Sequence, residues 1–317
     1  ATNDFVTLVI GNLISGLGVG LYWPATEAVV ADLTNSKNSR EAFAITRFAD
    51  NIGLGLGIVL AGILVANTAN YRLLFVIDGV SFIIFFGVIY AAIKPTSHHG
   101  NTASNSTQQQ VDSWVAALKD KRLIVFVVVN IIFTTYISQL HSTLPLYFKN
   151  FIQVSEVDKG FVETTISALF TWHLIVAIIA QLPVAQLTKR FSHFVALSIS
   201  ASAWAIGFIC IWVTGVSSSY SIVWAALALF LFALAIVSYT PSAAAFVSEI
   251  APVDKRGIYF SINSLCWAAG YLIGPPLGGW ALDQSRFVVN SFWLSLAASV
   301  VLTIAILRYL QRLILRS

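Results

Sequence analysis

The sequence predicts an all-α protein that crosses a membrane many times. Of its 317 residues, 57% are hydrophobic and 10% are charged, whereas soluble globular domains carry about 25% charged residues. Apolar stretches long enough to cross about 30 Å of hydrocarbon recur along the whole chain. Backbone polar groups in lipid must bond within their own segment, so stretches of this length span as helices. The pattern excludes an ordinary soluble enzyme and a nucleic-acid-binding domain, and the net charge of +4 indicates no nucleic-acid partner.

Nine segments are predicted to cross the lipid bilayer. They are residues 5–32, 42–67, 71–93, 122–148, 161–187, 194–216, 220–248, 257–281 and 288–310. The connections between them alternate in charge, and most of the 18 basic residues fall in one alternating set. The positive-inside rule places that set in the cytoplasm. We therefore predict a multi-pass protein of the inner or plasma membrane, with residue 1 outside and a cytoplasmic carboxyl terminus.

Residues 94–121 form the longest polar interruption of the chain. The first half is rich in Ser, Thr, Asn and Gln, which is typical of a flexible linker. Apolar residues at helical spacing over 111–118 then predict a short helix that lies on the membrane face. The predicted division is residues 1–94 with three helices, a cytoplasmic linker over 95–121, and a six-helix unit over 122–317.

The stretch 239–279 repeats the stretch 22–62 at a constant offset of 217 residues. The best-matched pairs are Glu249 with Asp32, Pro241 with Pro24, Gly270 with Gly53, Gly274 with Gly57 and Gly279 with Gly62. Both copies begin on helices of the same direction, so an axis along the membrane normal relates them. Three predicted spans precede the second copy. If the first half has the same number of helices as the second, about a hundred further residues with three helices are expected ahead of residue 1, in a protein of twelve helices.

The strongest local motif runs from Gly270 to Gly279 and reads Gly-Tyr-Leu-Ile-Gly-Pro-Pro-Leu-Gly-Gly. It resembles the Gly-x-x-x-Gly-Pro-x-x-Gly-Gly helix-packing motif of the major facilitator superfamily. The resemblance covers the whole chain as that family's fourth to twelfth helices. It implies the major facilitator fold, in which a parallel pseudo-two-fold axis relates two six-helix bundles, with about three N-terminal helices lacking here. It also implies a monomer.

Within that family the chain is most similar to bacterial multidrug-efflux members. The first-half copy of the glycine motif departs from the family's pattern, because Ile58 and Ala61 stand in place of proline and glycine. In the family this copy is associated with drug/proton antiport, so the departure weighs against antiport. The loop Leu187–His193 resembles a second family signature. The loop keeps the arginine of that signature, as Arg190, but lacks its acidic residue.

Glycines at four-residue spacing are predicted to bring helix backbones close together, and the neighbouring prolines are predicted to bend the helix. The residues assigned to helix packing or gating are Gly53, Gly57, Gly62, Gly270, Gly274, Pro275, Gly278 and Gly279. Close packing without a hinge explains the same pattern, so both interpretations stay open.

Ionisable side chains inside predicted spans are costly and therefore mark functional candidates. The residues assigned to a coupling or charge network are Glu27, Arg47, Asp50 and Asp78. Arg47 and Asp50 are three residues apart on one helix and can pair, and Glu27 lies at a similar depth. One interpretation is a network that breaks and re-forms during transport while a proton moves on a carboxylate. The other is a static salt-bridge cluster that orients helix ends.

Two further sets of residues are assigned roles. In the family, acids at the ends of matching helices hold the basic loop beside them. The resemblance therefore implies a cytoplasmic latch between Glu249 and Lys189 or Arg190, whereas Asp32 finds its partner ahead of residue 1.

The second set lies near the middle of the predicted span 161–187. Trp172 and His173 are candidates for the lining of a central cavity. A single histidine on an apolar helix is also a common hydrogen-bonded packing residue, and this alternative stays open.

The sequence contains no motif for an enzyme, a metal site or a cofactor. No HExxH, P-loop or Cys-x-x-Cys pattern occurs, and the two cysteines share no ligand spacing with a histidine. We therefore predict a secondary active transporter that works by alternating access and exports amphipathic small molecules in exchange for protons. The alternatives are a nutrient-uptake symporter or facilitator of the same superfamily, and a transport-inactive fragment or interaction protein.

Overall fold

The computed structural model describes residues 5–35, 38–68, 71–92, 107–152, 160–217 and 219–315. These ranges hold ten α-helices and one 3-10 turn, Val253–Lys255, and no strand lies within them. The α-helices are α1 (Phe5–Asp32), α2 (Ser39–Thr68), α3 (Tyr71–Ala92), α4 (Thr107–Lys119), α5 (Lys121–Asn150), α6 (Glu163–Thr188), α7 (His193–Val216), α8 (Ser221–Ile250), α9 (Arg256–Leu282) and α10 (Arg286–Leu315). The prediction of an all-α protein is confirmed.

Eight of these helices are long and apolar enough to cross a membrane, one fewer than the nine predicted spans. Among the nine predicted spans the exception is α9, which has 27 residues but carries the glycines and prolines of the motif together with polar side chains. One face of α9 packs along α5, where Gly270, Gly274 and Gly278 are buried. Because protein rather than hydrocarbon covers that face, the helix needs less apolar surface than a lipid-exposed span.

The predicted linker helix is present as α4, whereas residues 95–106 lie outside the described part of the chain. The next helix, α5, begins at Lys121 because Asp120 is its N-cap and accepts the Arg122 backbone N–H at 2.9 Å. The Arg122 guanidinium and the Tyr259 hydroxyl also donate to this carboxylate, at 3.1 and 2.9 Å. Burial acts to raise the pKa of Asp120, but these hydrogen bonds outweigh burial and lower its pKa.

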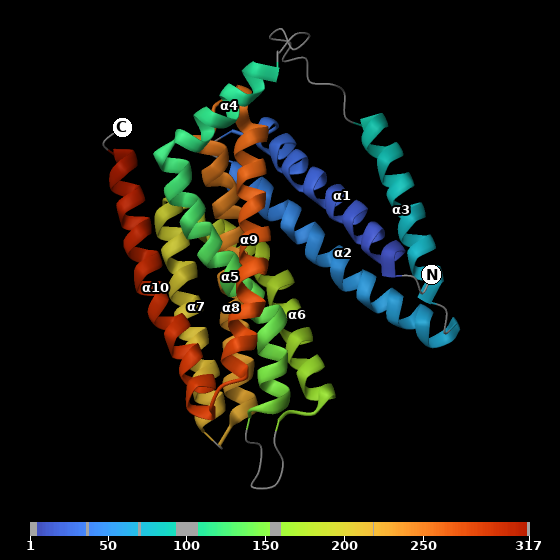
Figure 1. Ribbon diagram of the computed structural model, residues 1–317, viewed down its shortest axis with the longest axis vertical. Helices are drawn as coiled ribbons and strands as arrows, with labels where there is room; N and C mark the ends of the chain where they lie inside the picture. The colour runs from blue at the N-terminus through green and yellow to red at the C-terminus, as the bar shows by residue number, and fades with distance from the viewer. Residues whose placement is uncertain are drawn as a thin grey trace.

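Helices α5 to α10 form the main bundle, which holds most of the buried core (Figure 1). Aromatic side chains fill its interior. The ring centroids of Trp204 and Phe232 lie 4.6 Å apart, and those of Tyr136 and Phe208 lie 5.2 Å apart. All four residues are almost completely buried. This bundle provides the surface against which the first two helices pack.

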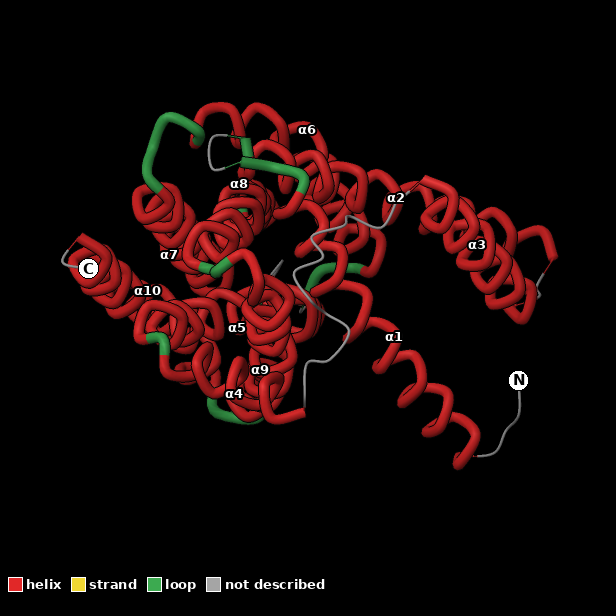
Figure 2. The backbone as a smooth tube through the Cα atoms, turned by 90° about the horizontal axis from the view of Figure 1, so that it is seen from above, coloured by secondary structure: helices red, strands yellow, loops and turns green. Residues whose placement is uncertain are grey.

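Helices α1, α2 and α3 lie to one side of the main bundle and lean away from it (Figure 1). α1 contacts α8 and α9, and α2 contacts α6 and α8. The buried residues of these helices cluster where α1 ends and α2 begins, from Pro24 to Ala44. We call this the α4 end of the molecule, because α4 lies there too. Viewed from that direction, α3 lies apart from the main bundle (Figure 2).

The internal repeat of the sequence is also a repeat of helices. α1, α2 and α3 correspond to α8, α9 and α10, and at the offset of 217 residues their starting positions agree to within two residues. The two trios share their order, but α3 has 22 residues whereas α10 has 30. They differ in burial, because large apolar side chains are exposed along α1 and α3 whereas α8 is largely covered by its neighbours.

Candidate functional site

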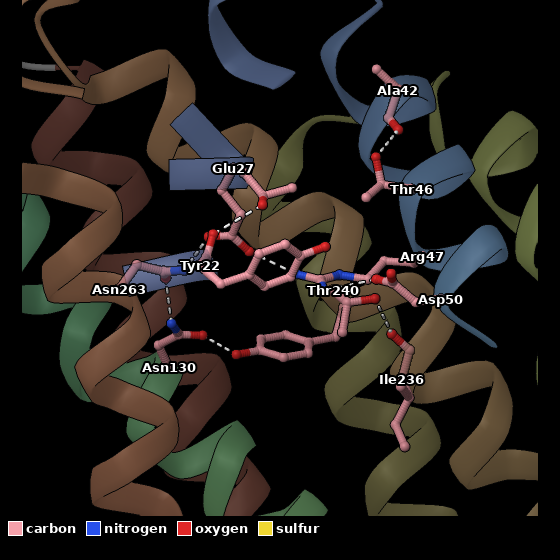
Figure 3. A network of polar contacts seen from close by, with 12 residues as sticks. Tyr22, Glu27, Ala42, Thr46, Arg47, Asp50, Asn130, Ile236, Thr240 and Asn263 are labelled. Carbon is pink, nitrogen blue, oxygen red and sulfur yellow. Dashed lines mark hydrogen bonds and ion pairs between the residues drawn. The ribbon is translucent and has the colours of Figure 1, made fainter. Parts of the chain in front are cut away.

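A charged centre lies where α1 and α2 meet the main bundle (Figure 3). Nη2 of Arg47 lies 2.6 Å from Oε1 of Glu27, and Nη1 of Arg47 lies 3.3 Å from Oδ2 of Asp50. The guanidinium also lies over the ring of Trp23, 4.7 Å from its centroid. Only 6% of Glu27 is exposed. The structure thus brings together three of the four residues assigned to the charge network.

Helical spacing explains why these side chains converge. Trp23 and Glu27 are four residues apart on α1 and therefore share one face, and Arg47 and Asp50 are three apart on α2. One guanidinium can consequently stack on an aromatic ring while it donates to two carboxylates. The fourth assigned residue, Asp78, is exposed on α3, away from this centre.

A chain of buried hydrogen bonds supports Glu27 from the main bundle. Nδ2 of Asn263 on α9 donates to Oε2 of Glu27 at 3.4 Å. Nδ2 of Asn130 on α5 donates to Oδ1 of Asn263 at 2.6 Å, and the hydroxyl of Tyr239 on α8 donates to Oδ1 of Asn130. These hydrogen bonds satisfy polar groups that would be costly to bury alone. The Glu27 carboxylate is therefore held by α2 on one side and by three helices of the main bundle on the other.

Sequence reasoning missed Trp23, Asn130, Tyr239 and Asn263. The available signal was the single polar residue Asn130 inside the apolar run of α5. Nothing in the sequence shows that this amide faces Asn263 on another helix, because the pairing depends on how α5 and α9 are rotated.

A small cavity opens beside the charged centre. Its lining consists of Glu27, Arg47, Tyr239, Thr240, Ala243, Ala244, Asn263 and Trp267. The described part of the chain contains no cluster of His, Cys, Asp and Glu that could hold a metal ion. At the charged centre itself, two carboxylates share one guanidinium.

The α4 end holds a second set of charged contacts between the two groups of helices. Arg40 on α2 is 6% exposed and donates to the backbone carbonyls of Thr188 and Phe191, the latter at 3.1 Å. Its Nη2 lies 2.9 Å from Nδ1 of His193, whose Nε2 lies 3.0 Å from Oε2 of Glu249. Since Arg40 can only donate, Nδ1 accepts and the proton of the neutral imidazole is on Nε2, toward Glu249.

These contacts correct the predicted pairing of the latch residues. Glu249 pairs with His193 rather than with Lys189 or Arg190, because the turn after α6 directs Lys189 toward α2. Nζ of Lys189 lies 2.7 Å from Oε2 of Glu41.

The prediction for Asp32 is corrected as well. Its Oδ1 lies 2.7 Å from Nη1 of Arg256 on α9, so Asp32 has an ion-pair partner within this chain. Arg190 is exposed and makes no ion pair within the described ranges. Sequence reasoning missed His193, Arg256 and Arg40 here. Arg40 lies at the first turn of a helix, where a solvated cation is ordinary.

Trp172 and His173 contact the backbone of α8. Nε1 of Trp172 donates to the carbonyl of Ala226 at 3.2 Å, and Nδ1 of His173 lies 2.9 Å from the carbonyl of Leu229. The indole also stacks on Phe230. These contacts join α6 to α8, and they support the packing alternative for His173 over the lining of a central cavity.

The motif glycines of α9 face α5. A Cβ atom at Gly270, Gly274 or Gly278 would collide with the side chain of Thr134, Ser138 or Thr143, respectively. Polar side chains of α5 also bond to the backbone of α9: Ser138 donates to the carbonyl of Gly270 at 3.1 Å and Gln139 donates to that of Gly274 at 2.7 Å. The second-half motif therefore acts as a close-packing surface.

The remaining motif positions do not share this role in the described structure. A Cβ atom at Gly53, Gly57 or Gly279 would meet nothing within 4 Å. The surroundings of Gly62 lie outside the described part of the structure. Pro275 lies inside α9, where it removes a backbone donor one residue after Gly274.

The helical fold and the charged contacts between two groups of spans define a multi-pass membrane protein of the transporter class. A family model described as Major Facilitator Superfamily matches residues 1–163 and 152–313. The chain belongs to this superfamily, whose members are transporters and not enzymes.

Individual relatives are distant. A Na(+), Li(+), K(+)/H(+) antiporter of Planococcus maritimus is 26% identical over 301 residues, which cover 88% of this chain and 69% of the relative. An uncharacterised transporter of the same superfamily from Bacillus subtilis is 24% identical over 96% of this chain and 72% of its own length. A crystal structure of a bacterial homologue of the iron transporter ferroportin, in an outward-facing state, has a TM-score of 0.73 at 16% identity, with 97% of this chain and 73% of that chain covered. At 16% identity, the similarity to this crystal structure shows a shared fold and not a shared function.

Proposed function

We propose that this protein is a proton-coupled antiporter in which Glu27 and Asp50 exchange a proton for substrate during alternating access. The observation that carries the proposal is the sharing of Arg47 by two carboxylates at the junction of the two helix groups. The printed name of the Planococcus relative, a cation/proton antiporter, supports the coupling ion. The predicted topology, with the α4 end cytoplasmic, makes this arrangement a conformation closed toward the cytoplasm.

The proposed exchange follows from charge balance at Glu27. With both carboxylates ionised, Arg47 neutralises one unit of their negative charge. A proton that binds Oε1 of Glu27 removes the ion pair with Arg47, which keeps Asp50 as its partner. The Asn263 amide then bonds to a neutral acid, so the contact between α1 and the main bundle weakens. Protonation in this way favours separation of the helix groups at the α4 end.

Two substrate classes fit the centre. Monovalent cations are favoured by the pair of carboxylates and by the Planococcus relative. Amphipathic organic cations are favoured by the indole of Trp23, which already holds a guanidinium, and by Trp267 in the cavity wall. In both classes the substrate cation takes the position of Arg47 beside a carboxylate.

Transport by the reconstituted protein distinguishes these possibilities. Proteoliposomes carrying an imposed pH gradient and a pH-sensitive dye would receive Na⁺, Li⁺, K⁺ or tetraphenylphosphonium in turn. Antiport is expected to dissipate the gradient upon addition of the transported cation. Proton movement in the same direction as substrate would indicate a symporter instead, and no response to any substrate would refute proton-coupled cation antiport.

Neutral variants test the role of the carboxylates. Glu27→Gln and Asp50→Asn are expected to lose gradient-driven transport but to retain exchange of labelled substrate at equal concentrations. Asp78→Asn is the matched control, because this carboxylate is exposed on α3 away from the centre. If gradient-driven transport is unchanged in both Glu27→Gln and Asp50→Asn, the coupling role of these carboxylates is wrong and a static salt-bridge cluster is the better interpretation.

A further inference from the structure

A groove on the outer surface of the main bundle is separate from the charged centre. It lies between α7 and α10, has a volume of about 550 Å³, and has Leu231 of α8 in its wall. Figure 1 shows these helices on the side of the bundle opposite α3. The proposed transport function makes no use of this groove.

The wall contributed by α7 is mostly an apolar stripe. Val195, Ile199, Ser202 and Ile206 recur at intervals of three to four residues and are all exposed. At 1.5 Å per residue the stripe is about 16 Å long. One leaflet is half of the roughly 30 Å hydrocarbon core, or about 15 Å. The stripe thus matches the length of an acyl chain that runs from the headgroup region to the middle of the bilayer.

Polar groups lie at one end of the groove. Arg308 and Gln311 on α10 contribute to the lining. α7 and α10 run in opposite directions, so the first turns of α7 and the last turns of α10 share the α4 end (Figure 1). Arg308 makes no hydrogen bond or ion pair with any residue in the described ranges. An arginine beside hydrocarbon is stabilised when an anion in the headgroup layer meets its guanidinium.

We infer that this groove binds a phospholipid with an anionic headgroup, taken from the leaflet at the α4 end. The guanidinium of Arg308 pairs with the phosphate through two parallel N–H donors, and the Gln311 amide donates a further hydrogen bond. One acyl chain lies along the α7 stripe. The guanidinium of Arg308 and the adjacent apolar groove together favour this lipid over a zwitterionic one, whose own cation would meet Arg308.

The test compares two lipids that share acyl chains and differ in headgroup charge. Purified protein in detergent would be titrated with dioleoylphosphatidylglycerol or dioleoylphosphatidylcholine, and bound lipid would be counted by native mass spectrometry. The wild-type protein is expected to retain one phosphatidylglycerol with at least tenfold higher affinity than phosphatidylcholine. Equal affinity for the two lipids would overturn the proposal.

A pair of α10 variants localises the site. Arg308→Gln is expected to lose at least tenfold in phosphatidylglycerol affinity, whereas Arg308→Lys retains most of the preference. Arg312→Gln is the matched control, because it removes the same charge one turn away and Arg312 does not line the groove. Equal losses in the two glutamine variants would indicate a general surface-charge effect and would refute the site.

A third variant tests the acyl-chain wall with Arg308 intact. Ser202→Phe fills the groove and is expected to abolish retention of the lipid while the protein stays monodisperse with unchanged helical content. Retention equal to wild type in a folded Ser202→Phe protein contradicts the proposal. Burial of the groove by a second copy, seen as a dimer that retains no lipid, contradicts it too.

Discussion

The contact of Arg40 with the turn after α6 leads to a prediction about conformational equilibrium. Arg40 belongs to α2, and its hydrogen-bond partners Thr188, Phe191 and His193 belong to the main bundle. These hydrogen bonds exist only while the two helix groups meet at the α4 end. Arg40→Ala is therefore expected to shift the protein toward conformations open at that end.

The size of the shift follows from the number and kind of hydrogen bonds. A hydrogen bond that involves a charged group contributes about 1.5–3 kcal/mol, and water replaces part of this contribution when the end opens. Because water replaces part of each hydrogen bond, we count one to two of the three at the lower value, which gives about 1.5–3 kcal/mol. That energy changes the equilibrium roughly 10- to 150-fold.

Cysteine labelling measures this shift. The native cysteines, Cys210 and Cys266, are both buried. A reporter cysteine at Ala44, which is completely buried at the α4 end, becomes reactive to a maleimide only when that end opens. The labelling rate of Ala44→Cys is expected to rise at least tenfold in the Arg40→Ala background.

Arg190→Ala is the control for the loss of a positive charge at the same end. Arg190 is exposed and forms no ion pair within the described residues. Equal labelling rates in the Arg40→Ala and Arg190→Ala backgrounds would refute the reasoning, because they would show that the hydrogen bonds of Arg40 do not hold the helix groups together.

Two further predictions concern stability. Gly274→Ala places a Cβ atom against the Ser138 side chain and is expected to destabilise the protein by about 1–3 kcal/mol. In the control variant Gly279→Ala the new Cβ atom meets open space, so the melting temperature is expected to stay unchanged or to rise. Equal melting temperatures of the two variants in a thermal denaturation assay would argue against the close-packing role of α9. The pKa of Asp120 is lowered in the folded protein, so its ionised carboxylate contributes stability above its unfolded-state pKa of about 3.9, and this contribution is lost as the pH falls through the folded pKa. Asp120→Asn keeps an N-cap but loses the ion pair with Arg122. On acidification, the melting temperature of this variant is therefore expected to fall less than that of the wild type. Parallel profiles of melting temperature against pH would show that the Asp120 carboxylate does not contribute this stability.

The all-α membrane class, the order of the helices and the internal repeat were all predictable from the sequence. Apolar runs of helix length are local features, and a fixed offset between two copies needs no knowledge of packing. The pairing of Arg47 with Asp50 was predictable for the same reason, since residues three apart on one helix must be neighbours. The second-half glycine motif predicted a close contact without identifying α5 as the partner.

Which helix faces meet could be seen only in the folded structure. The exchange of latch partners, with Glu249 on His193 and Asp32 on Arg256, depends on the direction of turns between helices. The hydrogen-bond chain from Tyr239 to Glu27 joins four helices, and the groove beside Arg308 exists because α7 and α10 run past each other. Hydropathy and spacing define each helix alone, whereas these contacts arise from the rotation and tilt of one helix against another.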